Sequence, residues 1–240
     1  MSRRIENEPA WLLHHRPYRD TSRILEILSR DHGRLSLVAR GSRAPRSRLS
    51  GVLRPFLPLT VSWVLRTELG TLTGADLRAR PIALTGDALM SGYYVNELLL
   101  YLLHRHDPQP EIFAAYSHTI ERLGAGHEVS PVLRAFEVEL LRLLGYGLIL
   151  DHDTERHAPL ERDARYEYRI EQGPVEAGNR QGSMLFSGAT LGAIRDGDFS
   201  SAEVLEAATR LLRQVIAHYL GGRELKTRRV LVDMRRNTDD

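Results

Sequence analysis

The chain has 240 residues, of which 33 are lysine or arginine, 31 are aspartate or glutamate and none is cysteine, for a net charge of +2. This length suits one large domain or two modest ones with a real core, and 42% hydrophobic with 27% charged residues is typical of a soluble globular protein. The lack of cysteine excludes a disulfide framework, a thiolate metal site and a cysteine nucleophile, and it is compatible with a reducing cytosol.

Short segments of alternating hydrophobicity in the first third of the chain predict β-strands. Leu35, Leu37 and Ala39 share one face of such a segment, and the other face is mostly polar. The expected strands cover residues 11–13, 23–28, 34–40, 57–65 and 69–73. Five strands within about 70 residues, separated by glycine and polar turns, indicate a small closed barrel rather than a sandwich. Trp11 and Trp63 fit the inward phase of their strands, so we expect both in the core.

A loop rich in glycine, serine and proline interrupts these strands at residues 41–54. Together with the residue before it, the loop carries five arginines and no acid: Arg40, Arg43, Arg46, Arg48 and Arg54. Phosphate backbones are bound by several spaced cations, and a guanidinium group can fork to two phosphate oxygens. The loop is therefore predicted to contact a nucleic acid, with Tyr18 as the more exposed stacking ring nearby.

From Asp87 onward the hydrophobic period becomes helical. Helices are expected at about 87–104, 112–123, 130–144 and 202–220, each ended by proline or glycine. Residues 151–188 show little periodicity. There we expect a loop-rich insert with a short hairpin, built from a strand at Tyr166–Ile170 and a turn at Gly173–Pro174.

The charge is distributed unevenly along the chain. Residues 1–80 carry a net charge of +8, residues 81–222 carry −8, and residues 223–240 carry +2. The sequence therefore predicts a polyanion-binding domain at 1–80 and a mostly helical domain at 81–240, with the insert at about 151–190 and a basic tail at 223–236. The expected fold class is α+β.

Motifs for catalysis and cofactor binding are missing. The chain has no phosphate-binding loop, no nucleophile elbow and no zinc-protease motif, so an enzyme is disfavoured and no cofactor is expected. The best metal candidate combines Asp151, His152, Asp153 and His157. However, the two histidines are five residues apart in a segment without periodicity, which favours a solvated loop over a metal site.

Several separated motifs resemble one family. They are residues 10–22, 33–41 and 53–56, Tyr93–Leu98, Leu133–Glu137 with Leu144–Gly147, and His218–Gly222 with Leu225–Arg228. In this order they resemble the bacterial recombination mediator family RecO. The resemblance implies an N-terminal five-stranded OB-fold barrel and a helical C-terminal domain. Many relatives carry a four-cysteine zinc site in the helical domain; this chain has no cysteine, so the insert must be held by packing.

The resemblance also implies a role in DNA repair and recombination by the RecF pathway. It implies binding of single- and double-stranded DNA, annealing of complementary strands without ATP, partnership with RecR, and docking of the acidic C-terminal tail of single-strand DNA-binding protein. It further implies a functional link to RecF and help in loading RecA at gaps.

The residues expected to contact DNA are Arg16, Arg34, Arg40, Arg43, Arg46, Arg48, Arg54, Lys226 and Arg228. Lys226 and Arg228 have an alternative role, which is to cap the last helix. By resemblance, the partner's tail is received by Arg134, with Leu140, Leu141 and Leu144 nearby. These leucines have an alternative role as core residues.

Two other functions remain open from the sequence. One is an RNA-binding OB-fold protein, because this fold serves both polymers. The other is a metal-dependent nuclease that uses Asp151, His152 and His157. The longest apolar run, Leu98–Leu103, is too short to span a membrane, and Met1–Glu6 lacks the apolar core of a signal peptide. We expect a cytoplasmic, nucleoid-associated protein.

Overall fold

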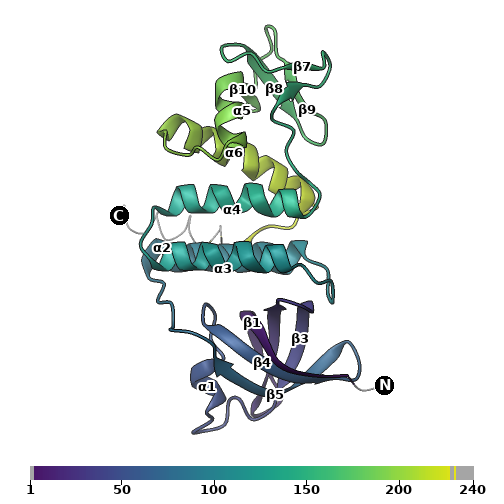
Figure 1. Ribbon diagram of the computed structural model, residues 1–240, viewed down its shortest axis with the longest axis vertical. Helices are drawn as coiled ribbons and strands as arrows, with labels where there is room; N and C mark the ends of the chain where they lie inside the picture. The colour runs from purple at the N-terminus through teal and green to yellow at the C-terminus, as the bar shows by residue number, and fades with distance from the viewer. Residues whose placement is uncertain (1–2, 228–229, 231–240) are drawn as a thin grey trace. The chain divides into compact units, whose positions relative to one another are not determined.

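The computed structural model describes residues 3–227 and 230, and Figure 1 shows the elements that they form. Packing divides the chain into two units. The barrel unit contains residues up to His127 together with the segment from Leu225, and the second unit is Glu128–Glu224. The packing division therefore differs from the predicted boundary after residue 80, because two helices group with the barrel. The predicted domains, 1–80 and 81–240, stay a prediction.

Five strands close into a barrel in the order β1-β2-β3-β5-β4. They are β1 (Arg3–Tyr18), β2 (Ser22–Ser29), β3 (Gly33–Ala39), β4 (Pro58–Leu65) and β5 (Leu69–Leu77). All neighbours are antiparallel except β3 and β5, and β1 is long enough to pair with both β4 and β2. The predicted OB-fold barrel is confirmed. The first strand starts at Arg3, well before the expected Trp11, because its first half alternates too weakly to be recognised.

The barrel interior is filled by the side chains that the alternation predicts. Leu35, Leu37 and Ala39 of β3 are buried there, and so are Val61 and Trp63 of β4. Trp11 is also buried, but it lies outside this cluster. On β1 the inward positions are Ala10 and Leu12, so Trp11 points away from the barrel. The inward position predicted for Trp11 is therefore wrong, although its burial is confirmed.

Two helices, α2 (Gly86–Leu102) and α3 (Pro110–Gly124), cover the outer surface of β1. Trp11 packs edge-on against Tyr116 of α3, with ring centroids 5.5 Å apart, and its indole N–H donates to Ser117 Oγ at 2.9 Å. Asn96 of α2 donates to the Leu13 carbonyl at 2.9 Å and accepts from the Tyr116 hydroxyl at 2.7 Å. Complete burial raises the pKa of Tyr116, so this hydroxyl remains a donor.

The second unit contains three helices and small sheets. Its elements are α4 (Val129–Leu143), β6 (His152–Asp153), β7 (Ala158–Pro159), β8 (Arg165–Arg169), β9 (Gly173–Glu176), β10 (Leu185–Ser187), α5 (Gly188–Arg195) and α6 (Ala202–Tyr219). Helix α6 packs against α4 and α5. The expected hairpin exists as β8 and β9, but Gly173 starts β9 instead of forming the turn. Helix α5 was not expected, because eight residues are too few to show a helical period.

A buried carboxylate organises the insert. Asp153 is 2% exposed, and its Oδ1 accepts the backbone N–H groups of Glu155 and Arg156, both at 2.9 Å. Its Oδ2 accepts the N–H of Glu176 on β9 at 3.0 Å. A small core that includes Tyr166, Tyr168, Val175 and Phe186 completes the insert. The predicted solvated loop is therefore wrong at Asp153, whose carboxylate ties two segments of the insert together.

We expect Asp153→Ala to lower the free energy of unfolding by about 2 kcal/mol or more, because three backbone N–H groups lose their acceptor. Urea denaturation followed by circular dichroism would measure this loss. The matched control is Asp151→Ala, which removes a carboxylate that is 62% exposed and should change stability little. Equal effects of the two substitutions would contradict the structural role of Asp153.

Candidate nucleic-acid interface

Two connections meet at one end of the barrel. These are the β1–β2 turn at residues 19–21 and the arginine loop at residues 40–54. The backbone N–H of Arg43 donates to the Thr21 carbonyl at 2.8 Å, and Arg23 on β2 lies opposite Ala39 at the end of β3. The Arg23 guanidinium also reaches the Leu53 carbonyl at 3.5 Å. Arginines that are distant in sequence are thereby gathered on one surface.

The arginine loop is a series of tight turns that ends in a short helix, α1 (Leu49–Val52). Backbone hydrogen bonds link Ala44 to Gly41, Ser47 to Ala44 and Ser50 to Ser47, each at 3.1 Å. Leu53 then enters the barrel core and anchors the end of the loop. The loop predicted from sequence is therefore an ordered scaffold, with its arginine side chains directed outward.

Six predicted arginines are exposed at this end: Arg16, Arg40, Arg43, Arg46, Arg48 and Arg54. No ion pair between described residues includes any of them. Sequence reasoning missed three further exposed arginines, Arg19, Arg78 and Arg80. The Arg78 N–H donates to the Pro58 carbonyl at 2.9 Å, which places this segment beside the start of β4. We call these nine residues the arginine end.

Other side chains at the arginine end add polar and aromatic surface. His15 is half-buried, and burial together with neighbouring Arg23 and His14 lowers its pKa, so it is mostly neutral at pH 7. Tyr18 is also half-buried, with the Arg19 guanidinium 5.2 Å from its ring centroid. Tyr18 is therefore less exposed than the sequence predicted.

Arg34 occupies a different place from the other predicted arginines. It projects from the outer face of β3, where its guanidinium lies 3.5 Å from Glu26 on β2 and its side chain is 13% exposed. Arg105, from the α2–α3 connection, binds the same carboxylate at 2.8 Å and also contacts Ser36. Burial lowers the pKa of Arg34. Arg105 thus joins the α2–α3 connection to the barrel, and the Arg34 guanidinium is committed to Glu26 instead of lying exposed for a DNA contact.

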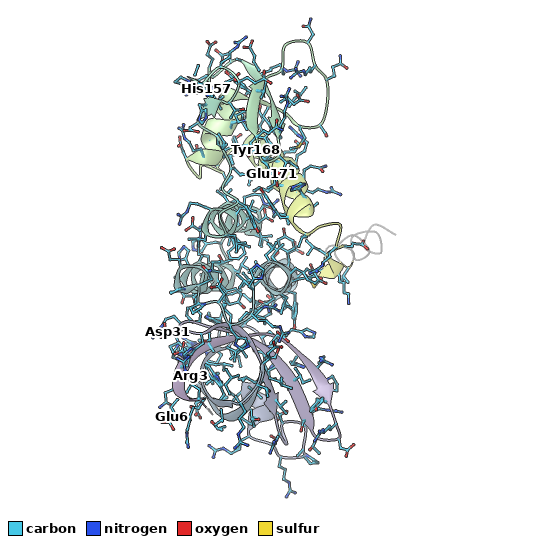
Figure 2. The ribbon with its side chains drawn as sticks, turned by 90° about the vertical axis from the view of Figure 1, so that its right-hand side faces the viewer. Arg3, Glu6, Asp31, His157, Tyr168 and Glu171 are labelled. Carbon is cyan, nitrogen blue, oxygen red and sulfur yellow. The ribbon has the colours of Figure 1, made fainter. Side chains whose placement is uncertain are left out.

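At the opposite end of the barrel, basic and acidic side chains neutralise one another. Arg4 pairs with Glu6 at 2.7 Å, and Arg30 pairs with Asp31 at 2.9 Å. The hydrogen bond from Arg30 lowers the pKa of Asp31. In Figure 2, Arg3, Glu6 and Asp31 lie toward the same side of the barrel. Arg3 and Arg66 are exposed at this end without an ion pair to a described residue, but the larger group of unpaired arginines lies at the arginine end.

A carboxylate on α2 holds the start of the C-terminal segment in the barrel unit. Glu97 on α2 accepts the N–H groups of Lys226 and Thr227, both at 2.9 Å, and the Thr227 hydroxyl at 2.6 Å. Leu225 is buried, whereas the Lys226 side chain is exposed. The predicted contact Arg228 lies outside the described residues.

The predicted tail-binding residues on α4 are mostly buried. Arg134 is 12% exposed and donates to Glu137 at 2.7 Å, and Glu137 is 1% exposed. Leu140 and Leu141 are core residues, so neither presents an open surface to a partner. Leu144 is half-buried at the end of the helix. Of the two roles considered for these leucines, the core role holds for Leu140 and Leu141.

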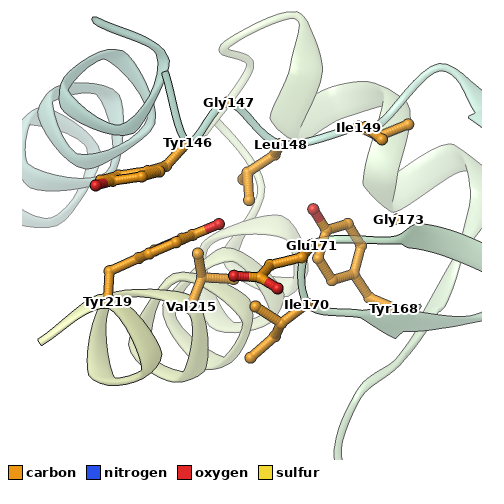
Figure 3. Close-up of a pocket in the computed structure, with 10 residues that line it drawn as sticks. All are labelled: Tyr146, Gly147, Leu148, Ile149, Tyr168, Ile170, Glu171, Gly173, Val215 and Tyr219. Carbon is orange, nitrogen blue, oxygen red and sulfur yellow. The ribbon is translucent and has the colours of Figure 1, made fainter. Parts of the chain in front are cut away.

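A small hollow lies beyond the end of α4 in the second unit. Tyr146 stacks on Tyr219 with centroids 4.1 Å apart, and the hollow is also lined by Tyr168, Glu171 and Val215 (Figure 3). Its volume of about 30 Å³ has room for water but not for a cofactor. The motifs Leu144–Gly147 and His218–Gly222, far apart in sequence, meet here.

A metal site does not form at the candidate residues. Both carboxylate oxygens of Asp153 are occupied by backbone N–H groups, and His152 pairs with Asp151 at 2.8 Å. Within the described ranges, no three histidine, aspartate or glutamate side chains come close enough to share a metal ion. Over the same ranges, every helix is too short or too polar to span a lipid bilayer.

Comparisons with known proteins match nearly all of the chain to one family. The description "Recombination protein O N terminal" matches residues 1–80, and "Recombination protein O C terminal" matches residues 83–229. The chain is 48% identical to the DNA repair protein RecO of Aromatoleum aromaticum, over 96% of this chain and 97% of the relative. It is 46% identical to that of Azoarcus sp., over 98% of each. For the relative from Methylococcus capsulatus the identity is 43%, over 94% and 92%.

The two kinds of arginine should respond differently to truncation. We expect Arg34→Ala to lower the free energy of unfolding by about 1–2 kcal/mol, because the half-buried Glu26 loses a partner. Arg43→Ala removes an exposed, unpaired side chain and should change stability by no more than about 0.5 kcal/mol. Chemical denaturation of both variants checks this. A loss for Arg43→Ala as large as that for Arg34→Ala would contradict the assignment.

Proposed function

The chain belongs to the RecO family of DNA repair proteins, and from that premise we propose that it binds single- and double-stranded DNA and anneals complementary strands without ATP. The observation that carries this proposal is the arginine end of the barrel. Nine exposed arginines there include at least six with no acidic partner among the described residues. Such a surface neutralises backbone phosphates and carries no base-specific geometry.

Annealing follows from the same chemistry. Two complementary strands repel one another through their phosphates, and a surface that neutralises both strands lowers that barrier without any bond being made or broken. Binding through backbone phosphates also leaves the base edges free to pair. The protein therefore needs neither nucleotide hydrolysis nor a catalytic residue for this step.

We further propose that the protein acts with RecR to load RecA onto gaps coated by single-strand DNA-binding protein, as part of the RecF pathway. This part of the proposal is supported by the family resemblance. For the acidic tail of single-strand DNA-binding protein we propose the surface near Arg134 and Leu144, where α4 supplies a guanidinium and an incompletely buried leucine follows its end. The proposed location is the cytoplasm, at the nucleoid.

Two alternatives are not carried further. The relatives are DNA repair proteins, so RNA binding gains no support. A nuclease using Asp151, His152 and His157 gains none either, because these residues do not gather with a third ligand in the described structure.

The proposal is tested by replacing Arg43, Arg46 and Arg48 with alanine. Five phosphate contacts to a single strand give a log–log salt slope of about −3.5, and losing three contacts reduces its magnitude by about 2. We expect this change in binding measured by fluorescence anisotropy, together with loss of annealing of complementary oligonucleotides precoated with single-strand DNA-binding protein.

The matched control replaces Arg4, Arg30 and Arg195, which are ion-paired with Glu6, Asp31 and Asp196. It removes the same charge from other surfaces, so binding and annealing should stay close to those of the intact protein. Equal annealing by the two triple variants would move the DNA site away from the arginine end. Failure of the intact protein to bind DNA at low salt would refute the proposed function.

A further inference from the structure

Tyr93 is an exposed aromatic residue on α2, a helix whose central residues are mostly buried. Its side chain is 39% exposed, whereas Val95, Leu98 and Leu99 on the same helix are buried. An exposed tyrosine offers a rigid apolar face at little conformational cost, which suits contact with a flat ligand.

The position of Tyr93 is set by the end of the arginine loop. Its ring lies edge-on to Phe56, with centroids 5.0 Å apart and planes at 71°. Phe56 is buried and has a φ of 65°, and it can approach the helix because residue 92 is glycine. A Cβ atom at Gly92 would lie 2.9 Å from the Phe56 ring. The helix and the loop are therefore in close contact at this point.

This contact places Tyr93 beside the arginine end. Arg54, two residues before Phe56, is exposed and unpaired, and the preceding residue, Leu53, is tied to Arg23 by its carbonyl. Figure 1 shows the start of α2 on the same side of the barrel unit as α1. Tyr93 therefore lies beside the end of the arginine loop, where Phe56 follows Arg54 by two residues, although it is outside the barrel.

Proteins that bind single strands combine a cationic path for the phosphates with aromatic faces on which bases stack. The barrel itself lacks an open face of this kind among its described residues: Trp11, Phe56 and Trp63 are buried, and Tyr18 is half-buried beneath Arg19. Tyr93 supplies the missing element. In a duplex the bases are already stacked on one another, so a side chain of this kind contacts unpaired bases only.

We propose that Tyr93 is a base-stacking residue, and that the DNA site extends from the arginine end of the barrel onto α2, where it holds an unpaired nucleobase. This inference rests on the proposed function and adds strand selectivity to it. The arginines bind both kinds of DNA, and Tyr93 favours the single strand. Because stacking is tolerant of sequence and reversible, the base can leave the ring to pair with an incoming complement.

The test compares Tyr93→Ala and Tyr93→Phe in the full-length protein, using anisotropy with a labelled oligo-dT strand and a labelled duplex of equal length. Tyr93→Ala should weaken single-strand binding about fivefold or more, with duplex affinity unchanged within about twofold. Tyr93→Phe keeps the ring and should bind both within about twofold of the intact protein. The matched control is Tyr146→Ala, which removes a tyrosine that is 40% exposed but lies in the second unit.

Two further measurements separate stacking from folding and from the proposed function. Thermal unfolding of each variant checks that Tyr93→Ala is folded at the assay temperature. Photocross-linking of the intact protein to an oligonucleotide containing 5-iododeoxyuridine should label the peptide that carries Tyr93.

If Tyr93→Ala binds the single strand normally while the Arg43, Arg46 and Arg48 variant does not, stacking by Tyr93 is refuted and the proposed function stands. Equal losses for single strand and duplex would also refute it. If the intact protein binds neither form of DNA, the proposed function itself fails.

Discussion

The barrel unit depends on the two-sided use of strand β1. Alternate residues of this strand point in opposite directions, so Ala10 and Leu12 close the barrel core while Trp11 and Leu13 face outward. The outward side chains would be an exposed apolar stripe if nothing covered them. These side chains are instead buried against α2 and α3, with hydrogen bonds from Asn96 and to Ser117. The same contacts join these two helices, which form a helical hairpin, to the barrel.

The hairpin determines which parts of the barrel remain available to a ligand. Its connection places Arg105 on the outer face of β2 and β3, where Glu26 and Arg34 complete an ion-pair cluster. OB-folds commonly use the face of these two strands for nucleic acids. Here that face carries a carboxylate and is partly covered by the chain itself. The arginine end stays open and unpaired, and the proposed function therefore assigns the phosphate backbone to the loops and the start of α2.

The insert in the second unit is organised around one buried carboxylate. Asp153 accepts three charge-assisted hydrogen bonds from backbone N–H groups in two segments of the chain. Together with packing by Tyr166, Tyr168 and Phe186, this holds the small sheets of the insert. Aspartate is a common residue, and no characteristic spacing in the sequence marks an aspartate that will be buried. The sequence analysis therefore assigned Asp153 to a solvated loop.

The sequence by itself determined the barrel strands, the long helices and the arginine loop, because alternation, helical period and clustered charge are local patterns. It also determined the family, through motifs in a shared order. Only the tertiary structure decided that Trp11 points outward, that Arg34 is committed to Glu26, and that Leu140 and Leu141 are core. It alone placed Tyr93 beside Phe56, at the end of the arginine loop. The reason is physical: whether a side chain is free to bind depends on which distant segment packs against it, and local sequence does not encode that contact.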